Sequence, residues 1–382
     1  MSETGYELLV KGGTLLDPGR GIHERRDIAF ADQKVVAEGP DLDAAEARTV
    51  VDATGKTVTP GLIDLHVHVF PGVSHFGIEP DATCLARGAT TVVDAGSSGA
   101  DTFPGFRKYV IEISETRIFA QLNISSQGMI TQAVGEFEVP EFADVARCTR
   151  TIEDNRDLIL GVKVRLTRNS IVSERSGMLP LHRAREAADA AGLPIMVHPQ
   201  AAWCDSLDDI LAVMGKGDIL THCYHDMDCG IMDESGRVRD SVRQAQERGV
   251  IFDVGHGAGS FSWSVVESAM QQGVLPDSIS SDLHIYNVDG PVYDLANVIN
   301  KFLLLGLTVE EAFARATSVP AGIIGMGEQI GTLQPGAWGD AVLFENRQGQ
   351  FRLEDSYGDS RTASRYLEPS VVVKSGRVYR QY

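Results

Sequence analysis

The chain has 382 residues, 43% hydrophobic and 23% charged, a balance typical of a soluble globular protein with one large domain and a smaller addition. Its formal net charge of −19 argues against nucleic acid and anionic membrane surfaces as partners, because both favour basic patches. Apolar runs stay below the ~18 residues of a membrane span, and MSETGYELL lacks the pattern of a signal peptide.

The five cysteines are scattered and odd in number, which is typical of a reduced, cytoplasmic protein rather than of a disulfide framework. We therefore expect a cytoplasmic protein.

Short apolar segments separated by turn signals fill both ends of the chain. Residues 6–57 contain the runs YELLVKG, DIAFADQKVVAEG and RTVVDATGKTV, with glycine, proline and aspartate between them. From about residue 331, DAVLFEN and VVVKSGRVY follow the same pattern, folded at Ser375-Gly376. We predict that residues 1–57 and 331–382 together build one small β-sandwich domain.

Residues 58–330 alternate short apolar strands with helical patterns such as 181–191, 236–248 and 262–272. The spacing leaves room for the crossover that parallel pairing requires after each strand. An α/β fold is therefore expected, with a (β/α)8 TIM barrel in this part of the chain. The eight expected strands are 62–69, 89–95, 118–124, 158–166, 193–198, 218–223, 249–255 and 278–283.

A doubly wound open sheet is the alternative architecture for such alternation. That fold usually carries a glycine-rich phosphate loop after its first strand, and HVFPGVSHFG does not match one. Thr308 and Glu311 have the capping-box pattern of a helix that follows the last strand. The barrel is the better interpretation.

The stretch PGLIDLHVHVF interrupts a buried strand with polar residues at every second position. Because strand side chains alternate between two faces, Asp64, His66 and His68 are expected on one face. Leu65 and Val67 are expected on the other. Burying two imidazoles and a carboxylate is unfavourable unless something satisfies them. We interpret Asp64, one layer deeper, as a support for its neighbours.

Further polar residues end other expected strands, where the active sites of such barrels lie. Taken singly, each is most often structural, but a cluster of this kind has no purpose in packing. Histidine is the commonest metal ligand and aspartate a common partner, so the cluster indicates a metal site. The residues are Lys163 and Arg165 in the fourth strand, His198 in the fifth, His222 in the sixth and Asp282 in the eighth.

DxHxH on the first strand, followed by this lysine, histidine and aspartate series, resembles the amidohydrolase superfamily over nearly the whole chain. VDAGSSGADTFPGFRKYVIE, GVKVR, FDVGHGAGSFSW and SISSDLH are similar to a narrower amidohydrolase/deacetylase subgroup. Members of that subgroup are sometimes labelled dihydroorotase or adenine deaminase. Hydrolysis of acetylated 2-hydroxy acids is attributed to it.

The resemblance implies a hydrolase that cleaves an ester or amide bond with a hydroxide bridging two divalent metal ions, zinc foremost. It assigns His66, His68 and Asp282 to one ion, His198 and His222 to the second, and Lys163 to both. Lys163 would carry a carbamate derived from carbon dioxide, because an ammonium would repel two cations and a carbamate spans ions about 3.5–4 Å apart. Asp282 would accept a proton and deliver it to the leaving group.

The expected substrate is a small molecule that bears a carboxylate, such as an O-acetyl 2-hydroxy acid. Arg165 can clamp a carboxylate, with a salt bridge inside the barrel mouth as the alternative. His256, among the glycines of VGHGAG, is a candidate oxyanion or carboxylate contact, with a loop-structuring role as the alternative. Asn123, at the end of the third strand, is a third candidate. No role is assigned to His75, His225 and His284.

Three other functions fit parts of the pattern. A cyclic-amide or N-acyl amino acid hydrolase, like dihydroorotase or D-aminoacylase, needs the same metal centre, although dihydroorotases usually have arginine where this chain has Phe70. Mononuclear deaminases generally lack the lysine and place a glutamate shortly after the fifth-strand histidine, where this chain has Pro199 and Gln200. A non-catalytic relative normally loses metal ligands that are all present here. Assembly into a homo-oligomer is left open.

Overall fold

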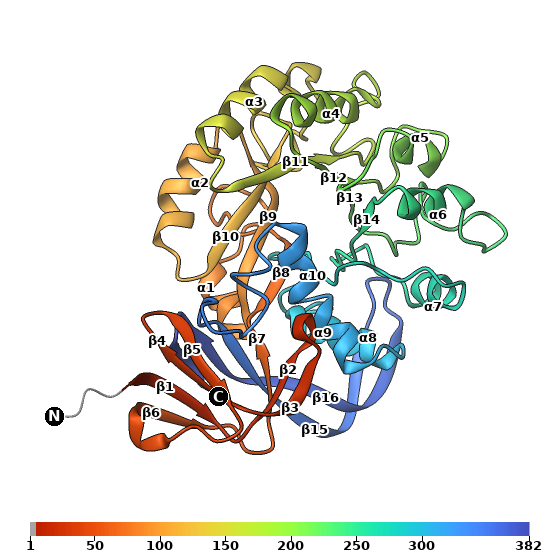
Figure 1. The fold of residues 1–382 in the computed structure, drawn as a ribbon. Coiled ribbons are helices and arrows are strands. Elements are labelled where there is room, and N and C mark those ends of the chain that lie inside the picture. The colour runs from red at the N-terminus through yellow and green to blue at the C-terminus, as the bar shows by residue number, and fades with distance from the viewer. Residues whose placement is uncertain (1–4, 382) are drawn as a thin grey trace.

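The computed structural model describes residues 5–381, and it consists of a curled parallel sheet ringed by helices beside a β-rich part (Figure 1). No helix within residues 5–381 combines the length and the apolar character needed to span a membrane.

A seven-stranded parallel sheet in the order β14-β13-β12-β11-β10-β9-β8 forms the barrel wall. Residues 278–283 close it, because Ser278 bridges Asp253 next to β14 and Leu283 bridges Val67 of β8, both in parallel. The (β/α)8 TIM barrel is therefore confirmed, although the eighth strand is reduced to these two bridges. The regular strands are β8 (Leu62–Val67), β9 (Ala89–Gly99), β10 (Arg117–Asn123), β11 (Ile159–Arg165), β12 (Ile195–His198), β13 (Ile219–Leu220) and β14 (Ile251–Phe252).

Helices cover the outside of the barrel and follow its strands in sequence (Figure 1). The expected capping box is present, since Thr308 accepts from the Glu311 amide and Glu311 accepts from the Thr308 amide. The helices are α1 (Pro80–Thr83), α2 (Phe103–Tyr109), α3 (Val145–Asp154), α4 (Leu179–Ala191), α5 (Leu207–Leu211), α6 (Asp240–Glu247), α7 (Trp263–Gln271), α8 (Leu295–Leu304), α9 (Val309–Ala314) and α10 (Ser318–Ile323). Short 3-10 helices occupy Pro18–Arg20, Ala44–Glu46, Leu85–Arg87, Ile111–Ile113 and Pro140–Phe142.

The two ends of the chain meet in a β-rich domain made of two sheets. Apolar residues from both ends, such as Leu8, Val58, Leu343 and Val373, share one buried core. One sheet has the order β5 (Lys34–Gly39), β4 (Asp27–Ala31), β1 (Tyr6–Lys11), β6 (Ala47–Asp52). The other has the order β17 (Arg377–Gln381), β16 (Ser360–Lys374), β15 (Ala341–Glu354), β7 (Thr57–Pro60), β2 (Thr14–Asp17), β3 (Ile22–Arg25).

The expected β-sandwich from both termini is thus present, and the domain boundaries at 57/58 and 330/331 stay a prediction.

The first barrel strand departs from simple alternation. The pairing of β8 with β9 shifts register between Asp64 and Val67. Leu65 consequently packs in a small core with Val93 and Phe119, whereas Val67 belongs to the large core. The prediction that Leu65 and Val67 share a strand face stays a prediction, since the irregularity in the ladder separates them into different cores.

Candidate metal centre

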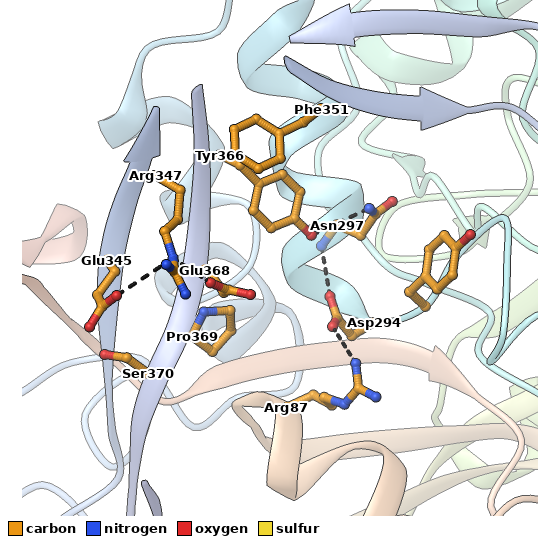
Figure 2. A pocket seen from close by; sticks show the side chains of 11 residues that line it. Arg87, Asp294, Asn297, Glu345, Arg347, Phe351, Tyr366, Glu368, Pro369 and Ser370 are labelled. Carbon is orange, nitrogen blue, oxygen red and sulfur yellow. Dashed lines mark hydrogen bonds and ion pairs between the residues drawn. The ribbon is translucent and has the colours of Figure 1, made fainter. Parts of the chain in front are cut away.

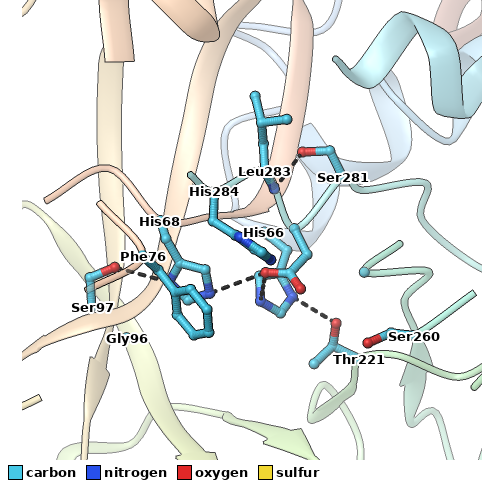
Figure 3. A network of polar contacts seen from close by, with 12 residues as sticks. His66, His68, Phe76, Gly96, Ser97, Thr221, Ser260, Ser281, Leu283 and His284 are labelled. Carbon is cyan, nitrogen blue, oxygen red and sulfur yellow. Dashed lines mark hydrogen bonds and ion pairs between the residues drawn. The ribbon is translucent and has the colours of Figure 1, made fainter. Parts of the chain in front are cut away.

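Residues from distant parts of the chain converge at the carboxyl ends of the barrel strands. His66, His222 and Asp282 are all buried, and one ligand atom from each lies within 4.8 Å of the others. His66 Nε2 and His68 Nε2 lie 3.3 and 3.1 Å from Asp282 Oδ1. Figure 3 shows the two imidazoles side by side, each held on its far side by a hydroxyl.

The hydrogen bonds of His66 fix which of its nitrogens is free. Its Nδ1 lies 2.8 Å from the hydroxyl of Thr221, and that hydroxyl donates to Asp253 at 2.8 Å. Because the one hydroxyl proton goes to the carboxylate, Thr221 accepts from His66 Nδ1–H. The lone pair of His66 therefore sits on Nε2 and faces Asp282.

His222 and Asp282 offer further unshared electron pairs to the same point. His222 Nδ1 lies 2.6 Å from the carbonyl of Gly255, which can only accept, so its Nε2 is bare. Asp282 Oδ1 is buried with no hydrogen-bond partner in the described part of the chain. Two imidazole nitrogens that carry lone pairs thus face a carboxylate oxygen that has no hydrogen-bond partner in the described chain, and this arrangement fits a cation.

The remaining two histidines adjoin this cluster. His68 Nδ1 lies 2.9 Å from the Ser97 hydroxyl, and the rings of His198 and His222 are 4.2 Å apart. His198 Nε2 lies 3.3 Å from the hydroxyl of Thr167, so Nδ1 is the ring nitrogen that is left for a metal ion. Burial holds the pKa values of His68 and His198 well below their usual range, so both imidazoles are neutral, as metal ligands must be.

Lys163 enters the cluster from β11 and is fully buried. Its Nζ lies 3.5 Å from His66 Nε2. Burial lowers the pKa of Lys163 to about 7, so a large fraction of the side chain is neutral amine near neutral pH. A free ammonium at this position would repel a bound cation, and burial favours the neutral amine instead.

Backbone strain gathers at the same place. His222 has a φ of 62° and Asp282 a φ of 50°, in the left-handed region that side chains other than glycine rarely adopt. Gly257 lets the chain approach Asp282, since a Cβ there would lie 2.4 Å from Oδ2. Such strain persists where surrounding structure imposes it, and it concentrates at functional sites.

A cavity of about 360 Å³ opens over the cluster. Its lining includes His68, His198, His222 and Asp282, together with Arg165. The guanidinium of Arg165 donates from Nε to Glu136 at 2.7 Å and stacks over Phe76. Its buried Nη2 has no hydrogen-bond partner within residues 5–381. The rest of the lining is Phe76, Gln132, Thr167, Ser170, Ile171, Gln200, Ala258, Gly259, Ser260, His284 and Tyr286.

Two predicted substrate contacts, Asn123 and His256, are not among the described residues that line this cavity. Asn123 is fully buried and donates to Gly96 and Glu136. His256 is also fully buried and stacks on Phe261, with Nε2 2.7 Å from Lys301 Nζ. Both side chains make these contacts within the protein, and a substrate contact from either residue stays a prediction.

Comparison with known proteins places this geometry in a family. Residues 57–379 match the amidohydrolase family. The chain belongs to the amidohydrolase family. A deacetylase of Enterococcus faecalis is 33% identical over 98% of this amidohydrolase and 99% of its own length. Crystal structures of an adenine deaminase and a dihydroorotase are each 32% identical, cover 98% of this chain and 100% of their own, and have TM-scores of 0.90 and 0.88. The protein is therefore a metal-dependent hydrolase of the amidohydrolase type.

Several residues of the amidohydrolase site were not foreseen from the sequence. Asp253 and Thr221 orient His66, and Glu136 holds Arg165. Asp253 carried a usable signal, because a charged residue inside the apolar run IFDVG stands out as Lys163 does in its own strand. Glu136 lies in a long loop and gave none.

Asp64 has the supporting position expected of it in the amidohydrolase barrel. It accepts from the amides of Ser281 and His66 at 3.0 and 3.2 Å and from the Ser281 hydroxyl. Burial raises the pKa of Asp64 to about 7. The side chain ties β8 to the segment that closes the barrel.

A second cavity of about 390 Å³ lies between α8 and the β15–β16 hairpin, away from the metal cluster (Figure 2). Its polar walls pair with one another, since Arg87 binds Asp294 and Arg347 binds Glu368. No predicted site residue of the amidohydrolase is among its described lining.

Replacing Thr221 by valine is expected to weaken metal binding by about 10- to 100-fold, because the Nδ1–H of His66 loses the acceptor that orients the ring. Competition with a chelator on the intact protein measures the affinity. Thr149→Val, which removes a hydroxyl bonded within α3, is the matched control and should leave it unchanged. Equal affinities for Thr221→Val and the parent would show that this hydroxyl does not orient His66.

Proposed function

We propose that this amidohydrolase is a binuclear zinc enzyme that deacetylates a small carboxylate, such as an O-acetyl 2-hydroxy acid. One observation carries the proposal: Arg165, whose buried Nη2 has no hydrogen-bond partner within residues 5–381, lines the same cavity as four residues of the metal cluster. The full-length similarity to a deacetylase of Enterococcus faecalis supports the reaction class. A cytoplasmic location stays a prediction.

The donor set divides between two ions in the proposal. His66, His68 and Asp282 would hold one ion, His198 and His222 the other, and Lys163 both. Divalent ions bound there supply Lewis-acid polarisation of a carbonyl and a water of lowered pKa. Burial supports modification of Lys163, because a neutral amine can form a bond to carbon dioxide with release of one proton.

Asp282 is placed to move the proton of the reaction. Its Oδ1 faces the imidazoles of His66 and His68, and the residue also lines the substrate cavity. A carboxylate that adjoins both the metal cluster and the substrate can accept a proton from the attacking water and return it to the leaving oxygen of the substrate. The surrounding imidazoles are neutral and cannot serve as acids at neutral pH.

Arg165 would bind the carboxylate of the substrate. Glu136 accepts from Nε, which fixes the orientation of the guanidinium, while Nη2 has no partner within the described chain. The Phe76 ring beneath it restricts its movement further. A substrate carboxylate held there lies in the same cavity as Asp282 and His222, which orients the acyl group relative to the metal cluster.

A cyclic-amide or N-acyl amino acid hydrolase is the second candidate, supported by the likeness to a dihydroorotase structure. Phe70, at the position where dihydroorotases usually have arginine, is buried against Phe106 rather than in the cavity. Deamination, the activity named for the adenine deaminase structure, finds less support. Gln200 follows His198 where deaminases place glutamate, and its amide donates to Gly259 and Ser260.

Hydrolysis of matched substrates by the zinc-loaded enzyme tests the proposal. The set contains O-acetyl and N-acetyl derivatives of the same aromatic 2-substituted acids, in both enantiomers. We expect preference for one O-acetyl enantiomer, since a fixed guanidinium and a fixed metal cluster define one handedness. Turnover confined to N-acetyl compounds or cyclic amides would favour the second candidate instead.

Arg165→Lys adds a test of the carboxylate contact within the same assay. Lysine keeps the charge beside Glu136 but loses the planar fork, so KM for the acid is expected to rise by about 10-fold or more. KM for the methyl ester of the same substrate should change little. Arg168→Lys, at a half-exposed arginine on the following loop, is the control. An unchanged KM in Arg165→Lys would remove Arg165 from substrate binding.

A further inference from the structure

Two cysteines face each other in the loops that follow β12 and β13. Cys204 Sγ and Cys229 Sγ lie 3.1 Å apart, and both are free thiols. The other cysteines of the chain, Cys84, Cys148 and Cys223, are buried and also free. Forming a covalent bond between the paired sulfur atoms requires a movement of only about 1 Å.

The backbone around the pair already joins the two loops. The Ala201 amide donates to the Asp228 carbonyl, and the Arg168 amide donates to the Ala201 carbonyl, each at 3.0 Å. Cys229 itself has a φ of 62°, so the surrounding contacts hold it in a left-handed conformation. The sulfur atoms therefore meet through a fixed arrangement of the chain.

Small solutes can reach the pair from outside. Cys204 is partly exposed, and both cysteines line a surface cavity of about 610 Å³ together with Arg168, Met227 and Arg239. In the described part of the chain this cavity shares no lining residue with the cavity over the metal cluster. An oxidant thus reaches the thiols without entering the substrate site.

The two thiols differ in acidity. The hydrogen bond between the two sulfur atoms lowers the pKa of the Cys229 thiol to about 7, which favours the thiolate on Cys229. By contrast, burial raises the pKa of the Cys148 thiol to about 12. Thiolates, not thiols, attack oxidants, so Cys229 is the nucleophile and Cys204 the second thiol.

We propose that Cys204 and Cys229 form a redox-active dithiol that a hydroperoxide oxidises to an intramolecular disulfide. The Cys229 thiolate attacks one peroxide oxygen, the O–O bond breaks, and a sulfenic acid forms with release of hydroxide or alkoxide. The Cys204 sulfur then attacks the Cys229 sulfur, the S–S bond forms, and hydroxide leaves and takes the Cys204 proton as water. The peroxide is reduced by two electrons and the dithiol is oxidised by two.

The cross-link would tie together the two loops that continue from His198 and His222. The loop after β12 also carries Gln200, which lines the substrate cavity. Oxidation would therefore restrain segments next to the metal cluster without altering its ligands. This property goes beyond the proposed function and does not depend on the identity of the substrate.

Treatment of the metal-loaded protein with hydrogen peroxide, followed by alkylation and peptide mapping, tests the proposal. When the oxidised protein is alkylated after denaturation, we expect a single cross-linked peptide pair containing Cys204 and Cys229, with these two thiols alone protected. Dithiothreitol should restore both thiols. Recovery of both cysteines fully alkylated after exposure that oxidises free cysteine would overturn the proposal, whatever the enzyme hydrolyses.

Serine variants separate the two roles. Cys204→Ser should give no cross-link and should accumulate a sulfenic acid on Cys229, which dimedone traps. Cys229→Ser should give neither product. Cys148→Ser, at a buried cysteine on α3, is the matched control and should cross-link as the parent does. Dimedone labelling of Cys204 in Cys229→Ser at the parent's rate of oxidation would contradict the assignment of Cys229 as nucleophile.

Discussion

Replacing Asp282 by asparagine is expected to lower kcat by about 10²- to 10⁴-fold, the range that general acid–base catalysis contributes. Asparagine keeps an oxygen that can face His66 and His68 but cannot accept the proton of the attacking water at neutral pH. The fold should persist, since Asp282 Oδ1 makes no hydrogen bond within the described chain. Steady-state kinetics, metal analysis and circular dichroism on the same preparation measure the three quantities.

Asp289→Asn is the matched control, because Asp289 is an exposed aspartate a few residues further along the same segment. It should turn over substrate at the parent's rate. If Asp282→Asn retained its metal and a near-normal kcat, Asp282 would not be the proton carrier. Loss of kcat together with loss of metal would instead assign Asp282 mainly to metal binding.

Replacing Lys163 by alanine is expected to reduce bound metal and to lower turnover by more than about 100-fold, because in the proposal it removes a direct ligand, and loss of even an outer partner of a metal site costs about 10- to 100-fold. In the proposal, the buried Lys163, whose Nζ lies 3.5 Å from His66 Nε2, is the ligand that both ions share. Short carboxylic acids should restore part of both metal content and activity, because they can occupy the space that the side chain leaves.

Lys108→Ala, at an exposed lysine on α2, serves as the control and should neither lose metal nor respond to added acid. Full metal content in Lys163→Ala, without any effect of acetate or propionate, would exclude a carbamate at this position. Metal loss that no carboxylic acid reverses would point to a packing role of the side chain against Gly96.

The fold class could be predicted from the sequence because its signals are local. Strand-length apolar runs alternating with helical patterns predicted the barrel, and the capping box at Thr308 and Glu311 is present as expected. Polar residues in otherwise apolar strand ends, such as His66 and Lys163, can likewise be recognised from the few residues on either side of them in the sequence. Two residues on one strand face, or at the end of neighbouring parallel strands, must lie close whatever the rest of the molecule does.

The positions of single side chains could not be predicted where an irregularity intervenes. The register shift between Asp64 and Val67 placed Leu65 in a different core from Val67. The eighth strand is only two bridges, at Ser278 and Leu283, although its sequence is typical of a strand. Pairing with strands that lie far away in the sequence decides both the register of β8 and the length of the eighth strand. The periodicity of the sequence carries no information about that pairing.

The sequence by itself determined the barrel, its β-rich companion and the residue types that gather at one rim. Only the tertiary structure decided which of those residues share a cavity, because hydrogen-bond partners come from distant loops. Glu136 accepts a hydrogen bond from Arg165, and Lys301 contacts His256. Cys204 and Cys229 come from two different loops and lie in contact. Periodicity reports the face on which a side chain lies, whereas its partner depends on how loops without periodicity close over the strand ends.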